Sequence, residues 1–118
     1  MVNANKKKGT TWESNVRDFL NSCGNDAHRV AQAGEDVGDV FLNGDFTLQC
    51  KDVARADYSG WLRSARKQAL AAKRRWGVVV HKRRQKGVGD GYVVMDLDTF
   101  AEITIRLKVL SQLAREKS

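Results

Sequence analysis

The sequence of 118 residues contains no proline, only two cysteines, and no long run of apolar residues. Without such a run we expect no transmembrane helix. Cys23 and Cys50 lack metal-binding spacing, so we expect reduced thiols, although spacing alone leaves a disulfide open. The first eight residues carry positive charge with no apolar segment after them, so we expect no secretory signal. These absences favour a cytoplasmic protein.

The length and composition of the chain suit one globular domain spanning residues 1–118. Hydrophobic residues make up 42% of the chain, enough for a modest core. Within it we expect a flexible basic terminus over residues 1–9 and a C-terminal helix over residues 97–118. The net charge is +7, which favours a polyanionic partner but does not choose between DNA, RNA and a membrane surface.

The pattern of apolar residues predicts the order α-β-β-β-α-β-β-α. A helix is expected over residues 10–23, with Thr10 as N-cap and Glu13 completing a capping box. The predicted strands cover residues 28–33, the two arms of a hairpin within 39–51, then 78–84 and 92–95. The longest helix is expected over residues 57–76, capped by Asp57 or Ser59. This helix can serve as a crossover between the third and fourth strands. The order of elements therefore predicts a mixed, twisted sheet flanked by helices.

The hairpin from Asp39 to Lys51 concentrates the residues that can carry chemistry. Alternation points Thr47, Gln49 and Lys51 to one face and the apolar residues between them to the other. A two-residue turn at Asn43-Gly44 would set Asp39 opposite Leu48, on the apolar face. A three-residue loop or a bulge would set Asp39 opposite Gln49 instead. We therefore predict a non-minimal turn, and a clean two-residue turn would contradict a site here.

This combination of side chains suits hydrolysis of a phosphodiester with a divalent cation. Asp39 offers a carboxylate, Gln49 a side-chain carbonyl, and Cys50 its backbone carbonyl, all hard oxygen ligands of the kind that Mg²⁺ or Mn²⁺ prefers. Lys51 would orient or deprotonate the attacking water or hold a phosphate oxygen. In competing interpretations, Asp39 ends a loop and Lys51 is a solvated lysine on an edge strand.

The residues Asp39 and Gln49-Cys50-Lys51 resemble the signature of the PD-(D/E)XK nucleases, with Gln49 in place of the second acid. The segment Lys8-Gly9-Thr10-Thr11-Trp12-Glu13 resembles the K-G-x-x-x-E opening of archaeal-type Holliday junction resolvases. The resemblance covers roughly residues 8 to 96. Two departures are the neutral Gln49 and Gly38, which stands where proline is usual. The serine found near the site in some resolvases is also missing.

The resemblance implies a restriction-endonuclease-like fold, an α/β domain with a mixed five-stranded sheet flanked by helices. It gives Glu13 a place among the metal ligands beside Asp39, Gln49 and the Cys50 carbonyl, with Lys51 as the catalytic lysine. It further implies a homodimer that makes paired nicks in branched DNA, a four-way junction, with Mg²⁺ or Mn²⁺. The corresponding location is a cytoplasm, near the nucleoid or as a viral or mobile-element product. Alternatives are a repair or mobile-element nuclease with another substrate, and a non-catalytic nucleic-acid-binding module.

Basic residues are abundant and few acids interleave with them between Arg63 and Lys86. We predict that these side chains contact nucleic-acid phosphates rather than only solvent. The long helix carries alanines more than large lipid-inserting residues, which disfavours a membrane surface. The predicted contact residues are Lys7, Lys8, Arg55, Arg63, Arg66, Lys67, Arg74, Lys82, Arg83, Arg84 and Lys86.

Overall fold

The computed structural model describes residues 4–117, and residues 1–3 and 118, at the ends of the predicted basic terminus and C-terminal helix, lie outside the described residues. The elements in order are α1 (Ala4–Ser22), β1 (Ala27–Arg29), β2 (Val40–Leu42), β3 (Phe46–Lys51), α2 (Tyr58–Ala72), β4 (Trp76–His81), the short 3₁₀ helix η1 (Val88–Asp90), β5 (Tyr92–Val94) and α3 (Leu97–Glu116). This confirms the predicted order of helices and strands. Within residues 4–117, no helix has both the length and the apolar character needed to cross a membrane.

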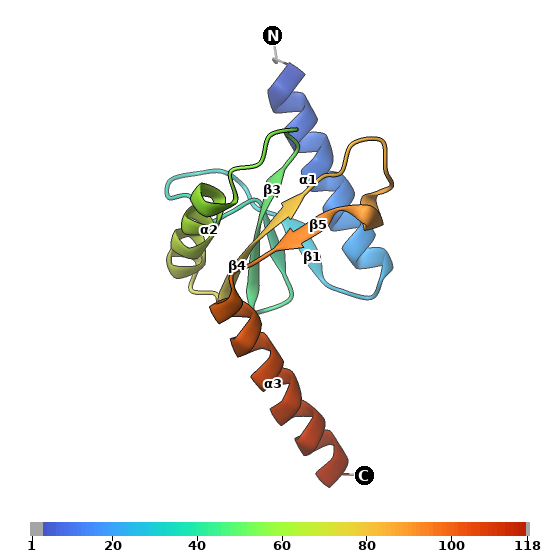
Figure 1. Cartoon of the computed structure of the whole chain (residues 1–118), viewed down its shortest axis with the longest axis vertical. Helices are drawn as coiled ribbons and strands as arrows, with labels where there is room; N and C mark the ends of the chain where they lie inside the picture. Colours follow the sequence, from blue (N-terminus) through green and yellow to red (C-terminus); the bar gives the residue numbers. More distant parts are fainter. Residues whose placement is uncertain (1–3, 118) are drawn as a thin grey trace.

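The five strands form one open sheet in the order β1-β2-β3-β4-β5. β1, β2 and β3 run antiparallel, β4 is parallel to β3, and β5 is antiparallel to β4. Only the parallel pair needs a long crossover, and α2 provides it. The α/β class and the mixed sheet are therefore confirmed. α1 packs on one face of the sheet and α2 on the other, while α3 projects away from the body (Figure 1).

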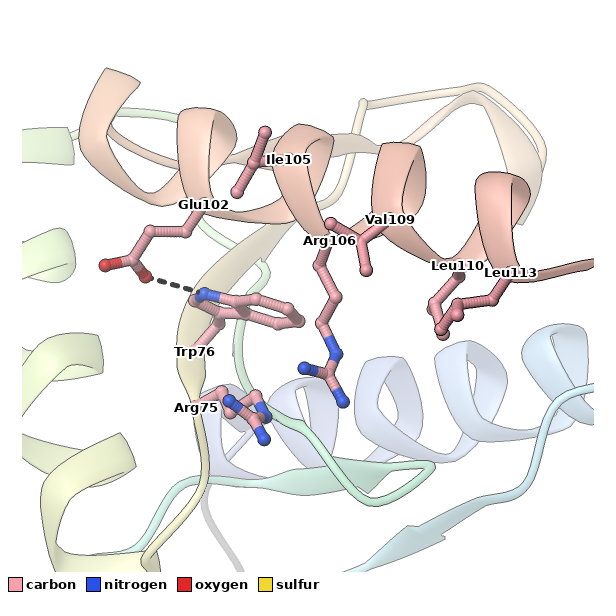
Figure 2. A pocket seen from close by; sticks show the side chains of 8 residues that line it. All are labelled: Arg75, Trp76, Glu102, Ile105, Arg106, Val109, Leu110 and Leu113. Carbon is pink, nitrogen blue, oxygen red and sulfur yellow. Dashed lines mark hydrogen bonds between the residues drawn. The ribbon is translucent and has the colours of Figure 1, made fainter. Parts of the chain in front are cut away.

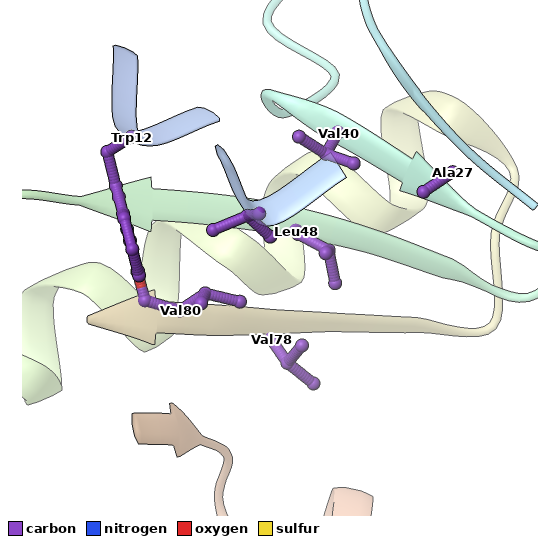
Figure 3. Close-up of a cluster of buried hydrophobic side chains, with 7 residues drawn as sticks. Trp12, Ala27, Val40, Leu48, Val78 and Val80 are labelled. Carbon is purple, nitrogen blue, oxygen red and sulfur yellow. The ribbon is translucent and has the colours of Figure 1, made fainter. Parts of the chain in front are cut away.

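The main core lies between α1 and the sheet. Trp12 and Val16 of α1 meet alternate residues of the central strands, Leu48 from β3 and Val78 and Val80 from β4. Figure 3 shows these side chains gathered on one face of the sheet. The buried Trp12 indole also donates a hydrogen bond of 3.1 Å to the Val80 carbonyl oxygen. Partly buried Phe46 and Cys50 pack against this cluster, which confirms the predicted apolar face of the hairpin.

The opposite face of the sheet is closed by α2 at very short range. Ala65 and Ala69 of α2 are buried, and a Cβ atom on Gly77 of β4 would collide with the Ala65 carbonyl oxygen. A glycine is needed here because the helix backbone approaches the strand backbone directly. Thr47 and Gln49 are buried on this side as well. The polar face of the hairpin is thus covered by a helix, whereas the sequence suggested an open one.

Three predicted boundaries are wrong by four residues or more, and β4 ends at His81 rather than at residue 84. α1 begins at Ala4, so Thr10 is inside the helix and cannot be its N-cap, which removes the predicted capping box. The prediction took the lysine-rich segment as flexible, yet Lys is a good helix former and one interior Gly costs only about 1 kcal/mol. β1 ends at Arg29 rather than at residue 33.

The third error concerns the end of the long helix. α2 stops at Ala72 because Lys73 adopts the left-handed conformation, with φ of 55°, and its N–H returns to the Ala69 and Leu70 carbonyls. Trp76, expected on the helix, therefore opens β4. The start was predicted correctly, since the Asp57 side chain caps α2 by accepting from the Gly60 amide.

Candidate functional site

The hairpin has the longer turn that the site requires. Leu42 pairs with Phe46 and Val40 with Leu48, which leaves three residues, Asn43, Gly44 and Asp45, in the loop. The left-handed position is Asn43, with φ of 51°, rather than the glycine. Its side chain accepts from the Asp26 amide and donates to Asn25. The paired register covers Val40 to Leu42 and stops before Asp39, so a position for Asp39 opposite Gln49 stays a prediction.

Asp39 immediately precedes β2, beside the part of β3 that extends beyond the paired residues. Its amide donates to the Leu48 carbonyl oxygen at 2.9 Å, and its own carbonyl accepts from the Val30 amide at 3.0 Å. Cys50 of β3 lies beyond the residues that pair with β2, and its amide donates to the Asp39 carboxylate at 2.8 Å instead. The carboxylate is therefore held beside the last two residues of β3, Cys50 and Lys51.

The loop before Asp39 is fixed by side chains whose role the sequence did not reveal. Gly38 is buried with φ of 105°, and a Cβ there would collide with the Thr47 hydroxyl. Thr47 donates to the Val37 carbonyl at 2.6 Å, and Gln32 donates to that of Gly38 at 2.8 Å. Asp36 accepts from the Gly38 amide and from the buried Gln68 side chain of α2. Asp36 thus holds the loop before Asp39 against α2. A glutamine on the buried face of a helix was the available signal for Gln68.

Glu13 reaches the same place from α1. Its side chain is 18% exposed and pairs with Arg29 of β1 at 3.2 Å. Burial and the neighbouring Asp39 carboxylate together raise the pKa of Glu13 to about 7, against the opposing effect of Arg29. The same burial and the two carboxylates raise the pKa of the Cys50 thiol. Two acids that repel each other in a half-enclosed place form a site of excess negative charge. Arg29 is a member that sequence reasoning missed.

Gln49 is buried, and its carbonyl oxygen Oε1 has no hydrogen-bond partner in the part of the chain that the structure describes. An unsatisfied buried amide oxygen is costly to the fold, and such atoms commonly mark a place for a water or an ion. Its neighbours along β3 are Cys50, bonded to Asp39, and Lys51. Gln49 thus offers one free oxygen near the strand end that carries the two carboxylates.

Lys51 is half-buried at the end of β3. Its ammonium group lies 5.6 Å from the centre of the Trp61 ring of α2, within cation–π range. His81, its partner on β4, accepts at Nδ1 from the Tyr58 hydroxyl, because its Nε2 must donate to the Val53 carbonyl oxygen. Among residues 4–117, Lys51 makes no ion pair or hydrogen bond with Glu13 or Asp39. The structure therefore brings Glu13, Asp39 and Cys50 together and sets Lys51 at the end of the same strand.

Part of the predicted basic surface gathers beside this strand end. Lys8, Lys82 and Arg84 each lie 3.7 Å from the carboxylate of Asp52, whose side chain is only 2% exposed. Asp52, interpreted from sequence as a turn residue, holds three cations from distant parts of the chain in one cluster. Lys82 is also joined to the end of β3, because its amide donates to the Lys51 carbonyl oxygen.

The other predicted contact residues are more dispersed. Arg74 supports the hairpin turn at the far end of β3: it donates to the Asn43 and Phe46 carbonyls and packs on the Phe41 ring. Arg66 pairs with Asp96, and Arg83 lies over the Tyr92 ring. Those exposed to solvent without such an arrangement are Lys7, Arg55, Arg63, Lys67 and Lys86.

Comparison of the chain with profiles of known protein families, with curated proteins and with solved structures found no match. Over residues 4–117, no group of three or more His, Cys, Asp or Glu side chains is placed to hold a metal ion. The acids that the structure brings together, Glu13 and Asp39, supply two carboxylates, which are hard oxygen donors.

Proposed function

We propose that this chain is a metal-dependent, structure-selective DNA endonuclease of the PD-(D/E)XK class, with the restriction-endonuclease-like version of the α/β fold. One observation carries the proposal. The hairpin has the three-residue turn that such a site requires, and the Asp39 carboxylate accepts from the Cys50 amide, one residue from Lys51. A one-residue shift in register would have placed Asp39 on the apolar face. The contact between Asp39 and Glu13 of α1 adds the fourth residue that the resemblance implies.

Glu13, Asp39 and Gln49 would hold a divalent cation, with the Cys50 backbone carbonyl as a further ligand. When bound, Mg²⁺ or Mn²⁺ supplies charge neutralisation on the phosphate and a water that is easier to deprotonate. Lys51 would orient that water or a phosphate oxygen, and Arg29, paired with Glu13, favours the ionised form of Glu13 against the effects of burial and of Asp39. The Trp61 ring limits the positions that the Lys51 ammonium can take.

The charged surface supports DNA as the substrate. The cluster of Lys8, Lys82 and Arg84 around Asp52 presents a net positive charge beside the strand end. Such a cluster binds backbone phosphates without reading bases, so recognition would depend on the shape of the DNA. By resemblance, the preferred substrate is a four-way junction, cut by a homodimer with paired nicks, in a cytoplasm where DNA is accessible.

The experiment is cleavage of a labelled four-way junction beside linear duplex, single strand and a flap, each with Mg²⁺ or EDTA. We expect symmetric nicks in the junction that require the metal. Cutting of the other substrates instead would keep the nuclease and reject the junction preference. Binding without cutting in Mg²⁺ and in Mn²⁺ would contradict the nuclease proposal.

One observation favours a second candidate, a non-catalytic nucleic-acid-binding module. Gln49 is neutral, so the site has two carboxylates instead of three, and this lowers the expected affinity for a divalent cation. A binding module would hold junction DNA equally well in Mg²⁺ and in EDTA. The nuclease should bind the cation itself, so its binding of junction DNA should differ between Mg²⁺ and EDTA.

A further inference from the structure

Beside the candidate site, side chains of β3, β4 and β5 form a row across the sheet. Lys51 of β3 pairs with His81 of β4, and His81 pairs with Tyr92 of β5. Paired residues on adjacent strands point to the same face of a sheet, and the contact of Lys51 with Trp61 shows that this is the face that α2 covers. With adjacent strands about 4.8 Å apart, Tyr92 lies about 10 Å from Lys51, or about three base steps of B-DNA.

Two members of this row, His81 and Tyr92, also line a hollow of about 240 Å³, together with Val53, Ala54 and the basic residues 82–84. Sites for whole small molecules usually measure roughly 300–1,000 Å³, so this hollow has room for one flat group rather than for a large ligand. His81 is buried and both of its ring nitrogens have partners. It is therefore a fixed wall of the hollow, and any ligand must be held by the other residues.

The Tyr92 ring is accessible to such a ligand. Its side chain is 50% exposed, and the guanidinium carbon of Arg83 lies 4.9 Å from the centre of the ring, within cation–π range. The Arg83 contact limits the movement of the ring while half of the residue stays in solvent. Aromatic rings and guanidinium planes stack on nucleobases of any sequence. Tyr92 and Arg83 therefore suit an unpaired base, whose faces are not already stacked inside a duplex.

The cations next to the hollow suit the phosphates on either side of such a base. Lys82 and Arg84 line the hollow and, with Lys8, surround Asp52. Each of these contacts is 3.7 Å long, too long for a hydrogen bond, and Oδ1 of Asp52 has no hydrogen-bond partner among the described residues. The three cations therefore keep their donors for a phosphate. Because Lys8 does not line the hollow, the cluster extends beyond one nucleotide, which favours a DNA strand over a free nucleotide.

A larger hollow lies at the other end of β4 and lacks these features. It has a volume of about 700 Å³ and is enclosed between α3 and Trp76 (Figure 2). Trp76 is only 7% exposed and its indole donates to Glu102, so its ring is closed to stacking. Arg75, which also lines this hollow, is paired with Asp45. Trp76 opens β4 and His81 ends it, so the larger hollow is also remote from Lys51.

We propose that the smaller hollow binds an unpaired base of the DNA, stacked on Tyr92 and Arg83, with the adjoining phosphates on Lys82 and Arg84. This inference rests on the proposed function and narrows its substrate class to branched DNA with an unpaired nucleotide at the branch point. A base enters such a hollow only after it has left its stack, and this costs least where pairing is already lost. Selection then depends on the structure of the DNA and not on its sequence, because every base has a flat face.

The test is equilibrium binding of the full chain to labelled DNA in EDTA, measured by fluorescence anisotropy. Three four-way junctions are compared: one fully paired, one with an unpaired thymine at the branch point, and one with an abasic nucleotide in place of that thymine. We expect the wild type to bind the thymine junction about tenfold more tightly than the abasic one, because only the thymine offers a base to stack. The two junctions carry the same backbone charge, so their difference isolates the base.

Two variants locate this preference. Tyr92→Leu should abolish it and keep the wild-type affinity for the abasic junction, whereas Tyr92→Phe, which retains the ring, should keep the preference. Arg83→Gln should weaken binding to all three junctions and reduce the preference. Arg106→Gln is its matched control: it removes the same charge from the larger hollow and should leave the preference unchanged. Tyr92 is exposed on an edge strand, so circular dichroism should show its variants folded.

Equal affinity of the wild type for the thymine and abasic junctions would overturn the inference, and so would a Tyr92→Leu variant that keeps the preference. The outcome is separate from that of the proposed function, because no cutting occurs in EDTA. Binding of all three junctions alike would contradict this inference alone and leave the nuclease standing. Failure to bind any junction would contradict both.

Discussion

At the scale of single residues, the site holds two carboxylates next to each other, an arrangement that lowers the stability of the fold. The carboxylates of Glu13 and Asp39 lie side by side, with Arg29 as the neighbouring cation. Folding would be easier with a neutral side chain at position 13. Residues that cost stability in this way are frequently kept for function, which is the reason to interpret the pair as a place for a cation.

The raised pKa of Glu13 predicts how stability changes with pH. The folded state keeps the proton up to about pH 7, while the unfolded state releases it near 4.5, so the folded state binds more protons in between. Stability due to this group is therefore lost as pH rises through that window. With the facing Asp39, Arg29 and Cys50 unchanged, Glu13→Gln should remove the loss and be more stable than wild type above pH 7, on the order of 1 kcal/mol after allowance for solvent.

The measurement is urea unfolding of wild type and Glu13→Gln at pH 5 and pH 8 in EDTA. The two proteins should differ little at pH 5 and diverge at pH 8. Titrating groups away from Asp39 and Cys50 affect both proteins equally, so the difference between the two proteins reports Glu13 and the groups that it faces. An equal stability gap at both pH values would show that Glu13 carries no such strain.

At the scale of elements, the sequence predicted more about the hairpin than about either terminus. The alternation of Phe46, Leu48 and Cys50 with polar residues fixed both faces of β3, and the need for a longer turn followed from register alone. Glu13, Asp39, Gln49 and Lys51 were predicted from this pattern and from the resemblance, and the structure brings Glu13 and Asp39 together. Arg29, Gln68 and Asp52 were missed, because their roles depend on partners at least 16 residues away that no local pattern connects.

The errors at the helix ends have local causes. The start of α1 was placed at Thr10 because a threonine before an apolar stripe is a common N-cap, but the lysines before it continue the helix at little cost. Trp76 was assigned to α2 because it continues the apolar spacing. The left-handed turn at Lys73 that ends the helix has no sequence signal, since glycine is the usual residue there.

The close approach of α2 to the sheet makes a prediction at this scale. Gly77→Ala should destabilise the fold by about 1 to 3 kcal/mol, because its methyl group would meet the Ala65 backbone and force α2 outward. The control is Gly44→Ala at the hairpin turn, where a Cβ would meet nothing within 4 Å. Chemical denaturation should show a loss for Gly77→Ala and a change within about 0.5 kcal/mol for Gly44→Ala. Equal effects would mean that α2 has room to move.

At the scale of the whole molecule, the functional features lie at two ends. The strand end with Glu13, Asp39 and Lys51 and the cluster around Asp52 form one region, and the projecting α3 forms another. The hairpin turn that Arg74 supports lies at the other end of β3, away from the region around Asp39 and Asp52. An arrangement of this kind leaves the candidate site and the basic cluster clear of α3.

Lys51 provides the most direct test of the central claim, that this strand end cleaves DNA. Nicking of a labelled four-way junction in Mg²⁺ should be compared for wild type, Lys51→Ala and Lys108→Ala, a control at an exposed lysine of α3. The account predicts a loss of at least about 100-fold in rate for Lys51→Ala, with junction binding nearly intact, and wild-type rates for Lys108→Ala. A folded Lys51→Ala protein that nicks at the wild-type rate, or no Mg²⁺-dependent nicking by the wild type, would contradict it.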